Sequence, residues 1–331
     1  MKSAPTESRI AVLGAGAWGT ALAASFARAG RDCLLWARAD DSVAAINSQH
    51  RNPRYLGDIA LPETLRATGN MAEALDGAGV ILLAVPAQTL RDFLADTLGS
   101  TAPRSVFVST AKGIDRETSH TMSEIIDDVA GRDRSAVLSG PSFAADVAAG
   151  LPTAVTVAAH DLETAKALAE VLSSKTLRCY ASDDLMGVEL GGALKNVLAI
   201  AAGIVHGANL GASAVAALTT RGFAELQRVA DALGAKPDTL AGLSGLGDLI
   251  LSCGSEKSRN FAYGAALARG EDLSNRPLAE GVFTASVAAR LAHGHDLDAP
   301  IISAIDAILA GNLTVEAAMS ELMSRPLKTE T

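Results

Sequence analysis

The chain has 331 residues, of which 49% are hydrophobic, 4% aromatic and 20% charged, and its formal net charge at pH 7 is -9. This length suffices for about two domains with substantial cores. The negative balance argues against nucleic acid as a partner, because a protein that binds the phosphate backbone needs clustered lysine and arginine. The net charge is nevertheless compatible with binding of a small anionic ligand wherever a few basic residues converge.

The sequence predicts neither a membrane span nor a metal site. The longest wholly apolar run, Val197 to Val205, is far shorter than the roughly 20 residues that cross a bilayer. Cys33, Cys179 and Cys253 are widely separated and lack metal-ligand spacing, which is typical of reduced thiols in a cytoplasmic protein. The pair in His293-Gly294-His295 lacks companion ligands, so we expect no metal there.

A glycine turn is the first motif that indicates chemistry. The apolar run Ile10 to Leu13 leads into Gly14-Ala15-Gly16-Ala17-Trp18-Gly19, and an alanine-rich helical pattern follows to about Arg28. Gly14 permits a tight turn, Gly16 lets a pyrophosphate approach the backbone, and Gly19 lets the helix lie close to the sheet. The helix start favours phosphate through its N–H groups and dipole. A secretory signal is the disfavoured alternative, because three glycines and a tryptophan interrupt the apolar segment.

Short β-rich runs alternate with helical patterns over the first half of the chain. The predicted strands are Ile10–Leu13, Cys33–Trp36, Gly79–Val85, Ser105–Thr110, Ala136–Leu138, Thr153–Ala158 and Leu177–Tyr180. Beyond about Asp183 strand-like runs disappear and helical patterns dominate, including Asp183–His206, Ala212–Leu233, Ser258–Arg269 and Ile301–Leu309. We therefore predict an α/β fold: a Rossmann-like, mostly parallel sheet in a dinucleotide-binding domain (1–187), and an all-α substrate domain (188–331).

Arg38 follows the second predicted strand, roughly 20 residues beyond the glycine turn, where an acidic residue often binds a ribose hydroxyl. A guanidinium at this position suits a 2′-phosphate, which favours NADP and leaves NAD open. The alternative is a solvated arginine beside Asp40 and Asp41.

Candidate substrate-binding residues follow two further predicted strands. Lys112 follows the predicted strand Ser105–Thr110, and the carboxyl end of a parallel strand is where a ligand lies. Gly140 and Ser142 occupy a similar turn, where they offer compact donors. On local pattern alone, that turn reads equally well as a plain turn in which Ser142 caps a helix.

Lys195 gives the strongest catalytic signal, because it lies inside a helix that is apolar nearly all round. Burial lowers the pKa of a lysine towards a value useful for proton transfer. A buried lysine needs a partner, and Asp248 lies in an equally apolar setting. We therefore hypothesise that they pair, either in catalysis or as a structural salt bridge.

Two later segments complete the candidate site. Ser258, Arg259 and Asn260 open a predicted helix, and a helix start with a guanidinium, a hydroxyl and an amide suits a phosphate monoester. The alternative is an N-cap with a surface arginine. Glu280, close after Leu278, is compatible with contacts to a coenzyme ribose or amide.

With these motifs in view, the chain resembles the bacterial NAD(P)-dependent glycerol-3-phosphate dehydrogenases along nearly its whole length. The resemblance is carried, in order, by Gly14–Ala23, Asn52–Leu56, Ala84–Pro86, Ala111–Gly113, Leu138–Ala144, Glu189–Val197, Gly245–Leu249 and Ser258–Asn260. It implies that Lys195 is the proton donor and acceptor. It implies substrate contacts at Lys112, Gly140, Ser142, Asp248, Ser258, Arg259 and Asn260. It implies coenzyme contacts at Ala17, Trp18, Arg38, Tyr55, Lys112, Ala144, Arg259, Leu278 and Glu280.

The expected reaction is the reversible reduction of dihydroxyacetone phosphate to sn-glycerol 3-phosphate by NADPH or NADH, which feeds glycerophospholipid synthesis. One alternative is another hydroxyacid dehydrogenase with a helical substrate domain. A second is a module that senses NAD(P)H without turnover. The aliphatic surface that the helical half must cover is compatible with a homodimer.

Overall fold

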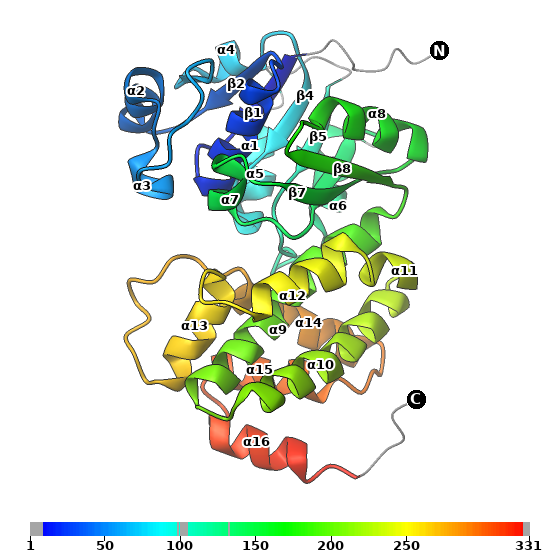
Figure 1. The fold of residues 1–331 in the computed structure, drawn as a ribbon. Helices are drawn as coiled ribbons and strands as arrows, with labels where there is room; N and C mark the ends of the chain where they lie inside the picture. The colour runs from blue at the N-terminus through cyan, green and yellow to red at the C-terminus, as the bar shows by residue number, and fades with distance from the viewer. Residues whose placement is uncertain (1–8, 98, 100–104, 132, 327–331) are drawn as a thin grey trace.

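The structure is a computed structural model that describes residues 9–97, 99, 105–131 and 133–326. Its upper half in Figure 1 is built on an eight-stranded sheet of order β3-β2-β1-β4-β5-β6-β7-β8. The strands are β1 (Arg9–Leu13), β2 (Cys33–Trp36), β3 (Arg66–Thr68), β4 (Ala78–Leu83), β5 (Val106–Ser109), β6 (Ser135–Ser139), β7 (Thr153–Ala159) and β8 (Leu177–Ser182). All neighbours pair in parallel except β6 and β7, which are antiparallel. The part from β3 to β6 has the Rossmann order.

Helices cover both faces of this sheet, because the strands are apolar on both sides. In β1, Ile10 and Val12 belong to one core and Ala11 and Leu13 to the other. The helices are α1 (Ala17–Arg28), α2 (Asp40–Gln49), α3 (Pro53–Leu56), α4 (Met71–Leu75), η1 (Ala87–Thr89), α5 (Leu90–Thr97), α6 (Met122–Ala130), α7 (Ala144–Ala148) and α8 (Leu162–Leu172). Buried residues of α1, α2, α7 and α8 share the first core, and those of α4, α5 and α6 share the second.

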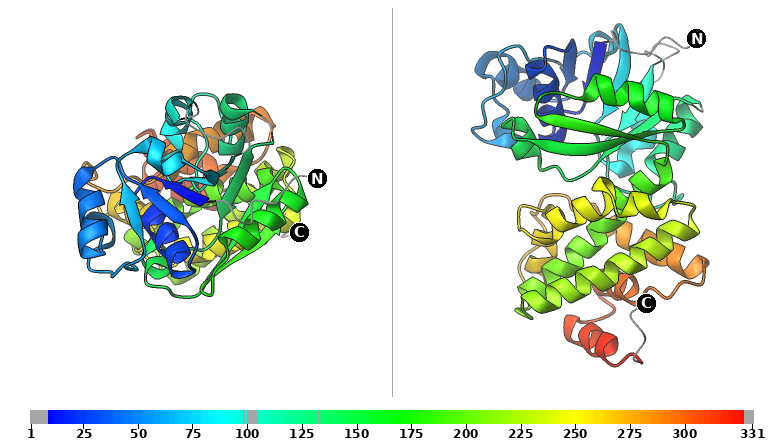
Figure 2. Two further views of the ribbon diagram at one scale, coloured as in Figure 1. Left: turned by 90° about the horizontal axis from the view of Figure 1, so that it is seen from above. Right: turned by 45° about the vertical axis from the view of Figure 1, so that its right-hand side comes forward.

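The lower half is helical and packs around α9 (Leu185–Gly207), which lies between the other helices in both side views (Figures 1 and 2). The other elements are α10 (Ala212–Ala232), α11 (Pro237–Leu240), the π-helical turn η3 (Leu243–Gly247), α12 (Asp248–Cys253), α13 (Arg259–Ala268), α14 (Gly281–Gly294), α15 (Pro300–Leu309) and α16 (Val315–Met323). Small residues bring α9 and α13 together: a Cβ on Gly264 would lie 2.1 Å from the Ile200 carbonyl oxygen.

The fold agrees with the predicted class, and each predicted strand is present. The prediction omitted β3, because Arg66–Thr68 is a three-residue edge strand with no apolar run of its own. The helices named from sequence also do not include α11, α12, α14 and α16. The proposed boundary between residues 187 and 188 falls in the first turn of α9, which begins at Leu185.

Helix α9 is longer than the wholly apolar run Val197 to Val205, from whose length no membrane span was predicted. This 23-residue helix has a mean hydropathy of 1.6 over its most apolar window and is long enough to cross a bilayer. That window is 100% buried inside the protein. Its length and apolar character therefore match those of a core helix, around which the helical half packs.

Candidate active site

The glycine turn joins β1 to α1 at the carboxyl edge of the sheet. Gly14 has φ +114°, and a Cβ there would lie 2.6 Å from the carbonyl oxygen of Ala84, the residue after β4. A Cβ on Gly19 would lie 1.9 Å from the Gly14 carbonyl oxygen, so only glycine lets α1 start so close to the strand. By contrast, a Cβ on Gly16 would meet nothing within 4 Å. The turn is therefore tight at two positions and open at the one that would face a ligand.

The other predicted coenzyme residues lie on several segments. Arg38 is exposed two residues after the end of β2, and Tyr55 is 45% exposed in α3. Ala144 is the first residue of α7, and Leu278 is 41% exposed in the segment before α14. Sequence alone left open whether Arg38 is only solvated, and its exposed position is compatible with both readings.

Lys195, Asp248 and Lys112 form one cluster, in which Lys195 and Asp248 are buried and Lys112 is half-buried. The Lys195 Nζ of α9 lies 3.1 Å from Asp248 Oδ1, and the Lys112 Nζ, which follows β5, lies 2.7 Å from Asp248 Oδ2. Lys112 also donates to the carbonyl oxygen of Gly140 at 2.9 Å. The hypothesised pairing of Lys195 with Asp248 is confirmed, and a second lysine shares the same carboxylate.

This arrangement sets the protonation of the cluster. Burial lowers the pKa of Lys195 to about 8, and the positive charge of Lys112 adds to that effect, while Asp248 opposes it. Burial favours the neutral form of Asp248, but the two ammonium groups outweigh it and hold the pKa of that carboxyl below its usual range. The cluster therefore contains an ionised carboxylate and an amine that titrates close to neutral pH.

Ser252 and Asn196 belong to the cluster but were missed from sequence. Lys195 Nζ donates to Ser252 Oγ at 2.6 Å, and Asn196 Nδ2 donates to the carbonyl oxygen of Lys112 at 2.9 Å. Ser252 stands four positions after Asp248, so the two share one face of α12. That helical spacing is the signal that could have identified Ser252.

An amide chain continues from this cluster towards α13 and α14. Asn260 Nδ2 donates to Asn196 Oδ1 at 2.9 Å, and the Gly281 backbone N–H donates to Asn260 Oδ1 at 2.9 Å. Both atoms of the Asn260 amide are thereby oriented, since exchanging them would put donor against donor. The amide of Asn260 is thus oriented at the start of α13.

The remaining predicted substrate residues lie around this cluster. Gly140 has φ +150°, and a Cβ there would lie 2.9 Å from the Cα of Val155. Ser142 Oγ donates to the Gly140 carbonyl oxygen at 3.0 Å. Ser258 is the N-cap of α13 and accepts from the Phe261 N–H at 3.4 Å, so the capping interpretation is confirmed. Arg259, the next residue, is exposed.

Several features of the carboxyl edge fit a nicotinamide dinucleotide. The N-cap of α1, Gly16, makes no side-chain cap, which leaves the helix start available to phosphate. Within the described chain, Trp18 Nε1 and Glu280 Oε2 are buried polar atoms without a hydrogen-bond partner. Glu280 Oε1 accepts from the Ala87 N–H at 3.3 Å, and burial raises the pKa of this carboxyl. A dinucleotide along this edge would supply partners of the kind these atoms lack.

A Rossmann sheet with such a turn, joined at the same edge to two lysines that share a buried carboxylate, defines a nicotinamide-dinucleotide-dependent oxidoreductase. Comparison with known proteins agrees. Residues 9–165 match the profile of the NAD-dependent glycerol-3-phosphate dehydrogenase N-terminus, and residues 184–320 match that of its C-terminus. The chain belongs to this family.

Relatives and a solved structure extend the match over nearly the whole chain. Glycerol-3-phosphate dehydrogenase [NAD(P)+] of Chelativorans sp. is 60% identical over 97% of this chain and 98% of its own. That of Brucella canis is 55% identical over 98% and 99%. The crystal structure of glycerol-3-phosphate dehydrogenase from Coxiella burnetii has a TM-score of 0.90 at 38% identity, covering 97% of this chain and 100% of that one.

Proposed function

We propose that the chain catalyses the reversible reduction of dihydroxyacetone phosphate to sn-glycerol 3-phosphate with NADPH or NADH, a product that feeds glycerophospholipid synthesis. The observation that carries the proposal is the cluster in which Lys195 and Lys112 share the two oxygens of Asp248. Membership of the glycerol-3-phosphate dehydrogenase family supports the choice of substrate.

Lys195 is the proposed proton donor. With a pKa of about 8, its amine is protonated at pH 7 and close enough to neutrality to work in both directions. A bound NAD(P)H supplies the hydride. Lys195 would donate its proton to the oxygen of the substrate carbonyl, while Asp248 holds the ammonium group and Ser252 orients it. Lys112 would help to hold the substrate at the same carboxylate.

The phosphate of the substrate would bind at the start of α13. Arg259 provides an exposed guanidinium, and Asn260 presents an oriented amide at the same helix start. Ser258 caps the helix, and Gly140 and Ser142 would complete the pocket from the loop after β6. Binding the remote phosphate would fix the carbonyl in place for reaction.

The coenzyme would lie along the carboxyl edge of the sheet. We assign its pyrophosphate to the glycine turn and the adenosine end to the segment that carries Arg38. The proposed contacts are Gly14, Gly16, Ala17, Trp18, Gly19, Arg38, Tyr55, Lys112, Ala144, Arg259, Leu278 and Glu280. Glu280 is suited to the carboxamide end, because its Oε2 is buried without a hydrogen-bond partner while its Oε1 accepts from the Ala87 N–H.

A coenzyme-oxidation assay tests this proposal. Dihydroxyacetone phosphate should cause a loss of nicotinamide absorbance with NADPH, NADH or both, whereas 2- and 3-oxo acids should not. A Lys195→Met variant should bind coenzyme as the wild type does yet lose turnover. Turnover with oxo acids alone would favour another hydroxyacid dehydrogenase, and coenzyme binding without any turnover would favour a sensing module.

Three further assignments belong to the proposal. We assign dinucleotide binding to residues 1–187 and substrate binding to residues 188–331. We propose a cytoplasmic location, supported by the free thiols of Cys33, Cys179 and Cys253. We propose a homodimer, supported by exposed apolar side chains on the helical half such as Ile250, which is 66% exposed. Light scattering on the purified protein tests the homodimer.

A further inference from the structure

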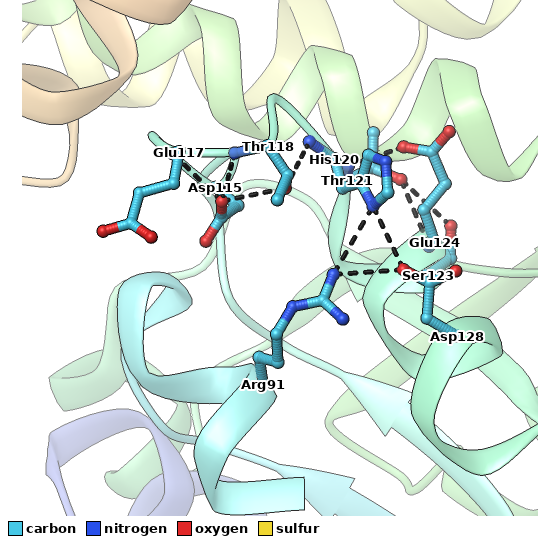
Figure 3. Close-up of polar contacts among 9 residues, drawn as sticks. All are labelled: Arg91, Asp115, Glu117, Thr118, His120, Thr121, Ser123, Glu124 and Asp128. Atoms are coloured by element: carbon cyan, nitrogen blue, oxygen red, sulfur yellow. Dashed lines mark hydrogen bonds and ion pairs between the residues drawn. The ribbon is translucent and has the colours of Figure 1, made fainter. Parts of the chain in front are cut away.

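The N-terminus of α6 is completed partly by its own residues (Figure 3). Thr121 is the N-cap, and its hydroxyl accepts from the Glu124 N–H while the Glu124 carboxylate accepts from the Thr121 N–H at 2.7 Å. This reciprocal capping box satisfies two N–H groups of the helix start. Both partners lie within the dinucleotide-binding half, and the box caps α6 from within that half.

Ser123, in the same helical turn, is held from the other half of the molecule. Its backbone N–H donates to Glu189 Oε1 at 2.8 Å, and its hydroxyl donates to Glu189 Oε2 at 2.5 Å. Glu189 belongs to α9, and both side chains are buried, with exposed fractions of 6% for Glu189 and 5% for Ser123. Burial raises the pKa of Glu189 to about 7, although the Ser123 hydrogen bonds oppose the rise. A buried carboxyl thus links two helices from different halves of the protein.

Glu189 lies on the stripe of α9 that faces the sheet domain. Gly192 and Asn196 follow it at spacings of three and seven, which places all three residues on one helix face. A Cβ on Gly192 would lie 2.4 Å from Ser139 Oγ, so the backbone of α9 packs closely against the Ser139 side chain there. Asn196 bonds the Lys112 carbonyl at the far end of the stripe. Directed hydrogen bonds therefore hold this face at both ends, and close packing holds it between them.

Lys195 is positioned by this face. It lies six residues beyond Glu189, which is about 9 Å along the axis of an α-helix. A shift or tilt of α9 on the sheet domain would move the Lys195 amine relative to the coenzyme edge. Misplacement by ~1 Å can cost on the order of 100-fold in rate. Asn196 lies within the reaction cluster, whereas Glu189 holds the helix from outside it.

We propose that Glu189 is a positioning residue for the reaction: its hydrogen bonds to Ser123 seat α9 on the dinucleotide-binding half and thereby place Lys195. This inference rests on the proposed function, in which Lys195 transfers the proton. Glu189 contacts neither the lysine pair nor Asp248 through any hydrogen bond of the described chain. It acts on the reaction only through the position of α9.

Three variants test the proposal. Glu189→Leu removes both hydrogen bonds, and Glu189→Gln keeps an acceptor for the N–H and a donor for the hydroxyl. Glu124→Gln is the control at the same helix start, because the Glu124 carboxylate accepts from the Thr121 N–H and makes no hydrogen bond to α9 among the described residues. We expect kcat to fall about tenfold or more in the Leu variant, on the scale of sub-ångström misplacement. The Gln variant and the control should stay within about twofold of the wild type.

Further readouts separate positioning from loss of fold. In Glu189→Leu the Kd for NADPH should stay near the wild-type value. The pH at which kcat/KM falls should shift, because the surroundings of the Lys195 amine change. Equal kcat in wild type and Glu189→Leu would overturn the proposal, as would an equal loss in the Glu124 control. If the Leu variant does not fold, Ser123→Ala removes the hydroxyl bond alone, and an unchanged kcat there overturns the proposal too.

The failure of the proposed function is distinguishable from the failure of this inference. If the wild type does not oxidise NADPH or NADH with dihydroxyacetone phosphate, the proposed function fails. Glu189 is then judged by the titration of Lys195 itself, followed by NMR of protein labelled with ¹³C at the lysine ε-carbon and assigned with Lys195→Arg. The pKa in Glu189→Leu should differ from the wild-type value by ~0.5 or more, and an identical pKa refutes the positioning role.

Discussion

Replacing Asp248 by asparagine removes the charge that Lys195 and Lys112 share while keeping the size of the side chain and one acceptor oxygen. The carboxylate lies 3.1 Å from the Lys195 Nζ. The carboxylate charge is spread over two oxygens, so the charge centres lie about 4 Å apart, where two unit charges interact by about 4 kcal/mol at an effective dielectric constant of ~20. If relaxation of the surroundings compensates for half of the lost interaction, about 2 kcal/mol remains. Because one pKa unit is about 1.4 kcal/mol, the pKa of Lys195 then falls by roughly 1.5, to about 6.5.

The expected result is a displaced pH profile for ketone reduction. The general acid must be protonated to react, so kcat/KM falls as the pH rises through the pKa of Lys195, which is about 8 in the wild type. In Asp248→Asn this descending limb should move to about pH 6.5, and at pH 7.5 the protonated fraction should be about eightfold lower. Initial rates with dihydroxyacetone phosphate from pH 5.5 to 9.5 measure the limb. Activity lost at pH 7.5 should return partly at lower pH.

A matched control separates this effect from a general change of charge. Asp183 pairs with Lys236 at 2.7 Å on the exposed surface, so Asp183→Asn removes an ion pair that touches no part of the cluster. Its profile should coincide with that of the wild type, because exposed pairs are well screened. A descending limb that stays near pH 8 in Asp248→Asn, with activity reduced equally at each pH, would refute the electrostatic role assigned to Asp248.

Three other predictions follow from particular contacts. Gly264→Ala should lower the free energy of unfolding by about 1–3 kcal/mol in urea titrations, because its Cβ would lie 2.1 Å from the Ile200 carbonyl oxygen. Gly294→Ala is the control: its Cβ would meet nothing within 4 Å, so the free energy of unfolding should stay at the wild-type value. Arg259→Lys should raise the KM for dihydroxyacetone phosphate about tenfold with a smaller effect on kcat, since an ammonium group cannot bind phosphate as a fork; an unchanged KM contradicts the phosphate site. The pKa of Glu189 is raised to about 7, so its contribution to stability is present below about pH 4.5 and is lost as the pH rises through 7. Glu189→Gln should remove that slope from unfolding free energies measured between pH 4.5 and 7.5, and an identical slope in both proteins would show that Glu189 is ionised throughout.

The sequence by itself determined the class of fold and most members of the site. Apolar runs alternating with helical patterns specify a sheet covered on both faces, because such strands cannot face water. The glycine turn is equally local: the positive φ of Gly14 and the crowding at Gly19 demand glycine whatever the rest of the chain does. The pairing of Lys195 with Asp248 could also be anticipated, since a buried ammonium group requires a counter-charge.

Only the tertiary structure decided which side chains share each contact. Lys112 and Asp248 are 136 positions apart, and nothing local in either segment fixes how the two carboxylate oxygens are divided between the two lysines. The Ser252 hydroxyl, the amide chain through Asn196, and the Glu189 carboxyl at the start of α6 were likewise invisible, because serine, asparagine and glutamate satisfy many local roles equally well. Their partners are set by how α9 seats against the sheet and against α12. Hydrogen bonds between distant segments depend on packing to within an ångström, which apolar periodicity does not encode.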